Sequence, residues 1–85
     1  MSQQNLQGKI RTRKALLVFC KDCASPMVLY FDEPEKIYED LKALINTKEI
    51  KMVEFEPIGP IKKAALTSDK IIALALQDEQ YIVRE

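Results

Sequence analysis

The segment "FDEPEKIYEDLKALINT", residues 31–47, is a helix pattern set between short apolar runs, and this contrast limits the fold more than any other feature. Asp32 is placed to cap a helix, Glu35 completes a capping box three residues later, and Pro34 lies in the first turn. The apolar residues recur at three- and four-residue steps, which predicts a helix that covers one face of a sheet. They are Ile37, Tyr38, Leu41, Leu44 and Ile45.

The runs on either side of this segment have the period of strands. From Lys9 the chain alternates and then enters "ALLVF", which predicts a strand that is exposed first and buried later. "MVLYF" predicts a second strand, antiparallel to the first because the connection "CKDCASP" is too short for a crossover. In "KEIKMVEFEP" the alternation of Val53 and Phe55 with charged residues predicts a half-buried strand.

The last third of the chain is open to two interpretations. The first has strands at residues 62–67 and 71–76, a tight turn at 67–69, a turn at "QDEQ" and a short final strand at "YIVR". The second has a helix that opens at Ser68, because alanine and leucine favour helices. A strand places Ile72, Leu74 and Leu76 on one face, whereas a helix groups Ile71, Leu74 and Ala75.

These elements predict an α+β fold in which one helix packs on one face of a small antiparallel sheet. The order is β-β-α-β-β-β, with "YIVR" as a short addition. Residues 1–8 are polar and lack any period, so we expect them to be a disordered leader. Because 85 residues are too few for two cores, we expect residues 9–85 to form a single domain. One helix covers one face of the sheet, yet apolar residues occur on both faces, which predicts a homodimer or another protein partner.

No apolar run approaches the roughly 18 residues that cross a bilayer, and the polar start has no apolar signal region. The prediction is therefore a cytoplasmic protein without membrane contact. The formal charge is zero, but residues 1–27 carry a net +4. A basic arm of this kind can bind nucleic acid, although a solvated terminus is the commoner explanation. The candidate residues are Lys9, Arg11, Arg13 and Lys14.

Cys20 and Cys23 are the only cysteines and are spaced Cys-x-x-Cys on a connection between strands. Such a turn can present two thiolates to one metal ion, but a closed site needs two more ligands, and the chain has neither histidine nor a third cysteine. A second chain would have to supply the missing ligands, or carboxylates such as Asp22 would complete a weaker site. A redox pair needs a helix after the first cysteine, whereas strand-forming residues follow here. Two structural thiols remain the simplest interpretation.

Catalytic residues and cofactors are not predicted. Without histidine, Ser68 has no ordinary base, and turn capping is its expected role. Glu54 and Glu56 share a strand face, which a solvated edge explains more simply than acid and base chemistry. The two glycines lie in no phosphate-binding pattern. The predicted function is a non-catalytic protein-binding or accessory module that self-associates, with a metal- or thiol-dependent regulator or a nucleic-acid-associated protein as alternatives.

The stretches "DEPEKIYEDLKALINTKEIKMVEFEP" and "KKAALTSDKIIALAL" resemble a family of short uncharacterised cyanobacterial proteins in the order of their elements. The resemblance covers residues 27–76, and "TSDKIIA" is its closest match in residues, with Lys70 as an extra position. It implies no activity and no site. The cysteine pair and the basic arm are not part of the pattern.

Overall fold

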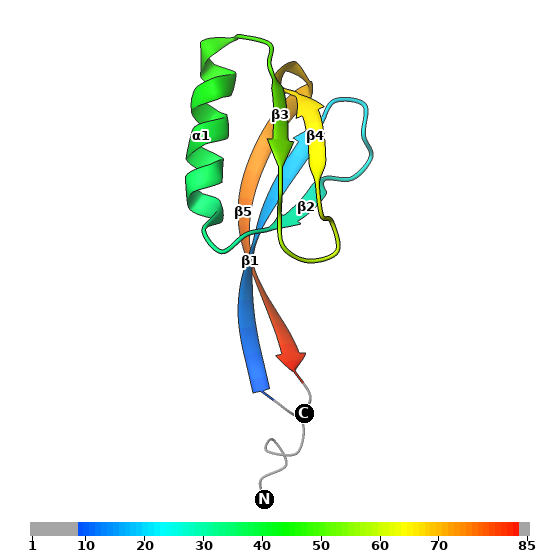
Figure 1. Cartoon of the computed structure of the whole chain (residues 1–85). Coiled ribbons are helices and arrows are strands. Elements are labelled where there is room, and N and C mark those ends of the chain that lie inside the picture. The colour runs from blue at the N-terminus through cyan, green and yellow to red at the C-terminus, as the bar shows by residue number, and fades with distance from the viewer. Residues whose placement is uncertain (1–8, 84–85) are drawn as a thin grey trace, which may run out of the picture.

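The computed structural model describes residues 9–83, which form one α-helix and five strands (Figure 1). The order β-β-α-β-β-β confirms the predicted α+β fold class. The predicted leader at residues 1–8 and the end of "YIVR" lie outside the described residues. The elements are β1 (Lys9–Cys20), β2 (Met27–Tyr30), α1 (Pro34–Thr47), β3 (Met52–Phe55), β4 (Ala64–Thr67) and β5 (Ile71–Val83).

The strands form two antiparallel sheets where one was predicted, with strand orders β2-β1-β5 and β3-β4. β2 pairs antiparallel with β1, as the short connection predicted. Because side chains alternate along β1, one face of the larger sheet carries Leu16 and Val18, and both α1 and β3 pack on that face. The core residues are Leu16, Val18, Leu29, Leu41, Phe55 and Ile71.

The helix lies where the sequence predicts, but its first turn is built differently. It runs from Pro34 to Thr47, and Leu41 is its buried centre. Asp32 does not cap it: Glu33 is the N-cap residue and makes no side-chain cap hydrogen bond. A start at Pro34 places Glu35 too early for a capping box, and its carboxylate binds Lys14 Nζ at 2.9 Å instead. No helix within residues 9–83 is long and apolar enough to cross a membrane.

The predicted turn at "QDEQ" is wrong, because β5 is one continuous strand from Ile71 to Val83. Every residue of this stretch pairs with β1, and Asp78 and Glu79 lie opposite Lys14 and Arg13. Opposite charges directly across a strand pair stabilise it, and this pairing outweighs the local turn preference of the polar residues. The alternative of a helix from Ser68 is also wrong, since only a 3₁₀ turn, Ser68–Lys70, precedes the strand.

A bulge at the start of β5 changes which residues face the core. The register with β1 shifts so that Phe19 lies opposite Ala73 and Cys20 opposite Ile71, which leaves Ile72 without a partner. Ile71 is therefore buried and Ile72 is 67% exposed. The prediction that Ile72 shares a face with Leu74 is wrong because an extra residue in one strand reverses the alternation beyond it.

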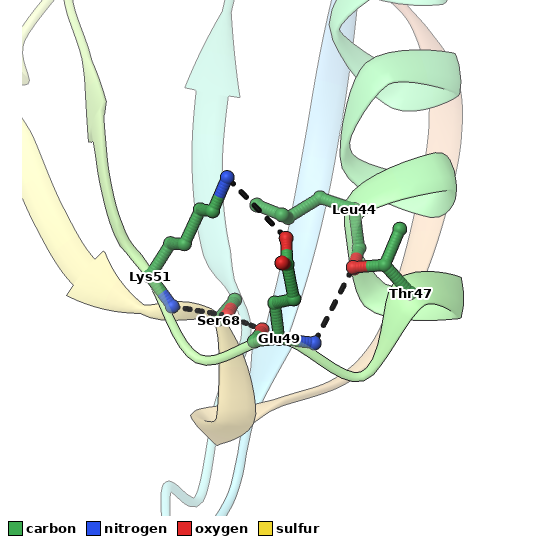
Figure 2. Close-up of polar contacts among 5 residues, drawn as sticks. All are labelled: Leu44, Thr47, Glu49, Lys51 and Ser68. Atoms are coloured by element: carbon green, nitrogen blue, oxygen red, sulfur yellow. Dashed lines mark hydrogen bonds and ion pairs between the residues drawn. The ribbon is translucent and has the colours of Figure 1, made fainter.

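Ser68 is the one buried polar residue among those described, and the prediction that it caps its own turn is wrong, because its hydroxyl bonds a distant connection instead. Figure 2 shows its hydroxyl between the backbones of Glu49 and Lys51, in the connection from α1 to β3. The hydroxyl donates to the carbonyl oxygen of Glu49 and accepts from the N–H of Lys51, both at 2.9 Å. The backbone N–H of Ser68 also donates to the Lys51 carbonyl at 2.8 Å. One side chain therefore ties two distant connections together.

Candidate functional site

One end of the β1–β5 ribbon extends away from the rest of the molecule (Figure 1). β2 pairs only with residues 15–18 of β1, whereas β5 pairs with β1 along its whole length. Residues 9–14 and 78–83, which we call the arm, therefore form a ribbon of two strands. Its six residue pairs span about 20 Å at roughly 3.3 Å per residue. A two-stranded ribbon alone is marginally stable in water, so added contacts would stabilise it substantially.

The arm exposes large apolar side chains. Ile10 and Ile82 lie opposite each other, and they are 69% and 57% exposed. Tyr81 on the opposite face is 40% exposed, and Leu76, just before the arm, is 43% exposed. Single exposed apolar residues are ordinary, but a group of them on one protruding ribbon is typical of an interaction site.

Arg13 anchors the base of the arm. Its Nε atom lies 3.3 Å from Glu79 Oε1, and its guanidinium carbon lies 4.0 Å from the centre of the Tyr30 ring and 5.2 Å from that of Tyr81. The Tyr30 hydroxyl donates to the same carboxylate oxygen at 3.0 Å. Burial and this bond to Glu79 raise the pKa of Tyr30, while the Arg13 charge opposes the rise. These contacts rigidify the arm where it leaves the core.

A hollow lies beside Arg13 at the base of the arm. It has a volume of about 430 Å³ and is lined in part by Tyr30, Tyr81 and Gly59. Arg13 and Tyr30, which also line the hollow, donate hydrogen bonds to the Glu79 carboxylate, and the Gln77 amide donates to it at 3.0 Å.

The four basic residues predicted to bind nucleic acid lie on the arm but do not form one surface. One face of the ribbon carries Lys9, Arg11 and Arg13, and the opposite face carries Lys14, because side chains alternate along β1. Arg13 forms an ion pair with Glu79, and Lys14 forms one with Glu35. Lys9 and Arg11 are exposed and form no ion pair with another residue of the range 9–83. The pKa of Lys14 is raised and that of Glu35 lowered, chiefly by the hydrogen bond between them. The nucleic-acid role stays a prediction.

The structure brings Cys20 and Cys23 together at the other end of β1. Cys20 ends the strand, Asp22 takes the left-handed conformation with φ 66°, and the Cys23 N–H donates to the Cys20 carbonyl at 3.2 Å. Both cysteines are free thiols. Within residues 9–83, no group of three or more metal-ligating side chains surrounds them or any other point. A metal held here would need ligands from a second molecule, and the metal role stays a prediction.

Cys20 is expected to react more slowly in the folded protein than in the unfolded chain. Burial raises the pKa of the Cys20 thiol, and the neighbouring Cys23 raises it further, so the reactive thiolate is rarer at neutral pH. The measurement is the rate of iodoacetamide alkylation of a Cys23→Ser variant, folded and in urea, from pH 7 to 10. We expect the folded curve to lie at higher pH. Faster reaction of the folded protein would indicate an activated thiol and favour the thiol-dependent alternative.

The arm was missed in the sequence because a turn was placed inside it. The signal that would have revealed it is the charge complementarity between Arg13-Lys14 and Asp78-Glu79, together with the matching isoleucines at 10 and 82. Both pairs are separated by more than sixty residues, so only a proposed strand register connects them.

The comparisons with known proteins add no relative to this description. The chain matches no protein-family model, and it has no significant match among curated proteins or solved structures. The resemblance to the cyanobacterial proteins therefore stays a prediction.

Proposed function

We propose that this protein is a non-catalytic binding module that acts in the cytoplasm and self-associates through its arm. The observation that carries the proposal is the pair of exposed isoleucines, Ile10 and Ile82, on a ribbon that lacks neighbouring strands. Burying apolar surface stabilises a contact by about 25 cal/mol per Å². Ile10 and Ile82 protrude from the rest of the molecule, so a second protein is needed to cover them.

The open face of the larger sheet supports the same proposal. Leu17, Phe19 and Val28 lie on the face opposite α1, as their registers require, and they are half-buried and outside the core cluster. Ile10 and Ile82 lie on the other face of the sheet, the face that carries Leu16, so this open face is a second apolar surface available to a partner. Interfaces between identical subunits are commonly built from such surfaces.

The test is the subunit count of the purified protein and of two matched variants. Native mass spectrometry and light scattering at micromolar concentration should give a dimer for the wild-type protein. Ile82→Lys should shift the dimer to monomer, because a charge in an apolar contact is costly to bury. Gln80→Lys is the control, since it adds the same charge two residues away on the same face of β5.

A wild-type protein that is monomeric at all accessible concentrations would contradict self-association. A dimer that persists in Ile82→Lys as it does in Gln80→Lys would show that the arm is not the contact. Circular dichroism of both variants checks that they remain folded, so that loss of the dimer is not loss of the fold.

A further inference from the structure

We infer that two copies of the chain pair through the free edge of β5, antiparallel and about a two-fold axis at Glu79, to form one continuous six-stranded sheet. This inference rests on the proposed self-association and specifies its register. The strand order would be β2-β1-β5 in one copy followed by β5-β1-β2 in the other. Four features define this register: the exposed edge of β5, the position of α1, the apolar side chains and the charges.

The outer edge of β5 is long and unprotected. β5 has thirteen residues and is the last strand of its sheet, so one of its edges pairs with β1 and no strand from residues 9–83 lies beside the other. Edge strands are usually shielded by proline, lysine, a bulge or a short length. The stretch from Ala73 onward has no proline, no lysine and no bulge. An edge of this kind adds a strand readily, and a second copy supplies one.

The helix determines which part of that edge is accessible. α1 borders the start of β5, where Tyr38, Lys42 and Ile45 line a groove of about 310 Å³ together with residues 71–74. Residues 75–83 lie beyond this groove. When a strand pairs antiparallel with its own copy, the two-fold axis lies where a residue meets its own copy or between two residues. An axis at Glu79 pairs residue 76 with 82, 77 with 81 and 78 with 80.

This register brings the exposed apolar residues together. Leu76 of each copy lies opposite Ile82 of the other, and these side chains are 43% and 57% exposed in the single chain. Within each copy Ile82 lies opposite Ile10, and Leu76 lies opposite the buried Leu16. The four residues therefore form one apolar row across the dimer, from the arm of one copy to the core of the other. Cross-strand apolar pairs each stabilise a sheet by about 0.2–1 kcal/mol.

The charges at the axis balance. Glu79 of one copy lies opposite Glu79 of the other, and like charges in this position are destabilising by themselves. Each carboxylate is bonded to its own Arg13 at 3.3 Å, so the row of four charges runs positive, negative, negative, positive and sums to zero. On the opposite face, Asp78 meets the neutral Gln80 of the other copy, and neither face places two unpaired charges of the same sign together.

The register also separates the cysteines of the two copies. Cys20 lies opposite Ile71, eight residues from the axis at Glu79, so the two Cys20 residues would be roughly 50 Å apart at about 3.3 Å per residue. A four-cysteine metal site shared across this dimer is therefore excluded. A strong chelator should leave the dimer intact.

Engineered cysteines test the register directly. In a Cys20→Ala/Cys23→Ser background, Glu79→Cys places the two thiols opposite each other, where cross-strand Cβ atoms are about 4.5–5.5 Å apart. Mild oxidation should then give a covalent dimer that dithiothreitol reverses. Gln77→Cys is the matched control, because its two copies would be about 13 Å apart along the strands. A mixture of Gln77→Cys and Tyr81→Cys chains should crosslink, whereas Gln77→Cys alone should not.

The outcomes separate the register from self-association itself. The proposed register is supported if Glu79→Cys crosslinks and the mixture of Gln77→Cys and Tyr81→Cys chains also crosslinks. Gln77→Cys alone must give no crosslink. Crosslinking of Gln77→Cys alone would overturn it in favour of a register whose two-fold axis lies at residue 77. A background protein that is dimeric by native mass spectrometry, with no crosslink in any variant, would overturn the β5 contact and leave self-association standing. A monomeric background protein would overturn both proposals.

Discussion

Replacing Leu16 with alanine is expected to lower the free energy of unfolding by about 2–5 kcal/mol. Leu16 is fully buried at the centre of the larger sheet, opposite Leu29 of β2 and Leu76 of β5. The close packing of the two neighbouring strands prevents them from filling the cavity. At roughly 0.1 kcal/mol per residue, a chain of this length has a total stability on the order of 8 kcal/mol, so the loss is a large fraction.

The measurement is urea unfolding followed by far-ultraviolet circular dichroism at one fixed protein concentration, because association stabilises the folded state by mass action. Ile50→Ala is the matched control: it removes an aliphatic side chain that is 69% exposed in the connection after α1. A change within about 0.5 kcal/mol is expected there. Equal losses in the two variants would contradict the placement of the core around Leu16.

Ser68→Ala is expected to cost about 1–3 kcal/mol, a large effect for the loss of one oxygen atom. The hydroxyl is 3% exposed and holds both the Glu49 carbonyl and the Lys51 N–H (Figure 2). Its removal leaves two backbone groups without their hydrogen-bond partner, and poorly hydrated groups of this kind are costly. The same urea experiment measures the loss.

The chain contains a natural control for this effect. The Thr47 hydroxyl also joins two backbone groups, donating to the Leu44 carbonyl at 2.6 Å and accepting from the Glu49 N–H at 3.3 Å, but it is exposed. Water replaces its bonds in a Thr47→Val variant, so the expected cost is well below that of Ser68→Ala. A larger loss in Thr47→Val would show that burial of the Ser68 bridge is not what makes it important.

These two predictions concern the body of the molecule, and the arm is expected to behave independently of it. Ile82 lies six residue pairs from Leu16 along the β1–β5 ladder, because it pairs with Ile10, and it has no part in the core cluster. Variants of the arm should therefore change the subunit count. They should lower the free energy of unfolding mainly because the stabilisation by association is lost. This separation allows the dimer to be tested without destroying the fold.

The sequence alone determined the elements whose signals are local. The helix from Pro34 to Thr47 follows from apolar residues at three- and four-residue steps, because 3.6 residues complete each turn. The antiparallel pairing of β1 with β2 follows from a connection too short for anything else. The α+β class follows from these elements together, since an amphipathic helix needs an apolar sheet face to cover.

Only the tertiary structure decided the features that join distant parts of the chain. Gln77 to Gln80 look like a turn by themselves, yet they are strand because β1 offers a complete row of hydrogen bonds and two charges opposite Asp78 and Glu79. The bulge that buries Ile71 and the bridge made by Ser68 are likewise set by residues more than fifteen positions away. The arm arises from the same cause: its strands are far apart in sequence, and pairing between them, not local preference, makes the edge that we propose a second copy covers.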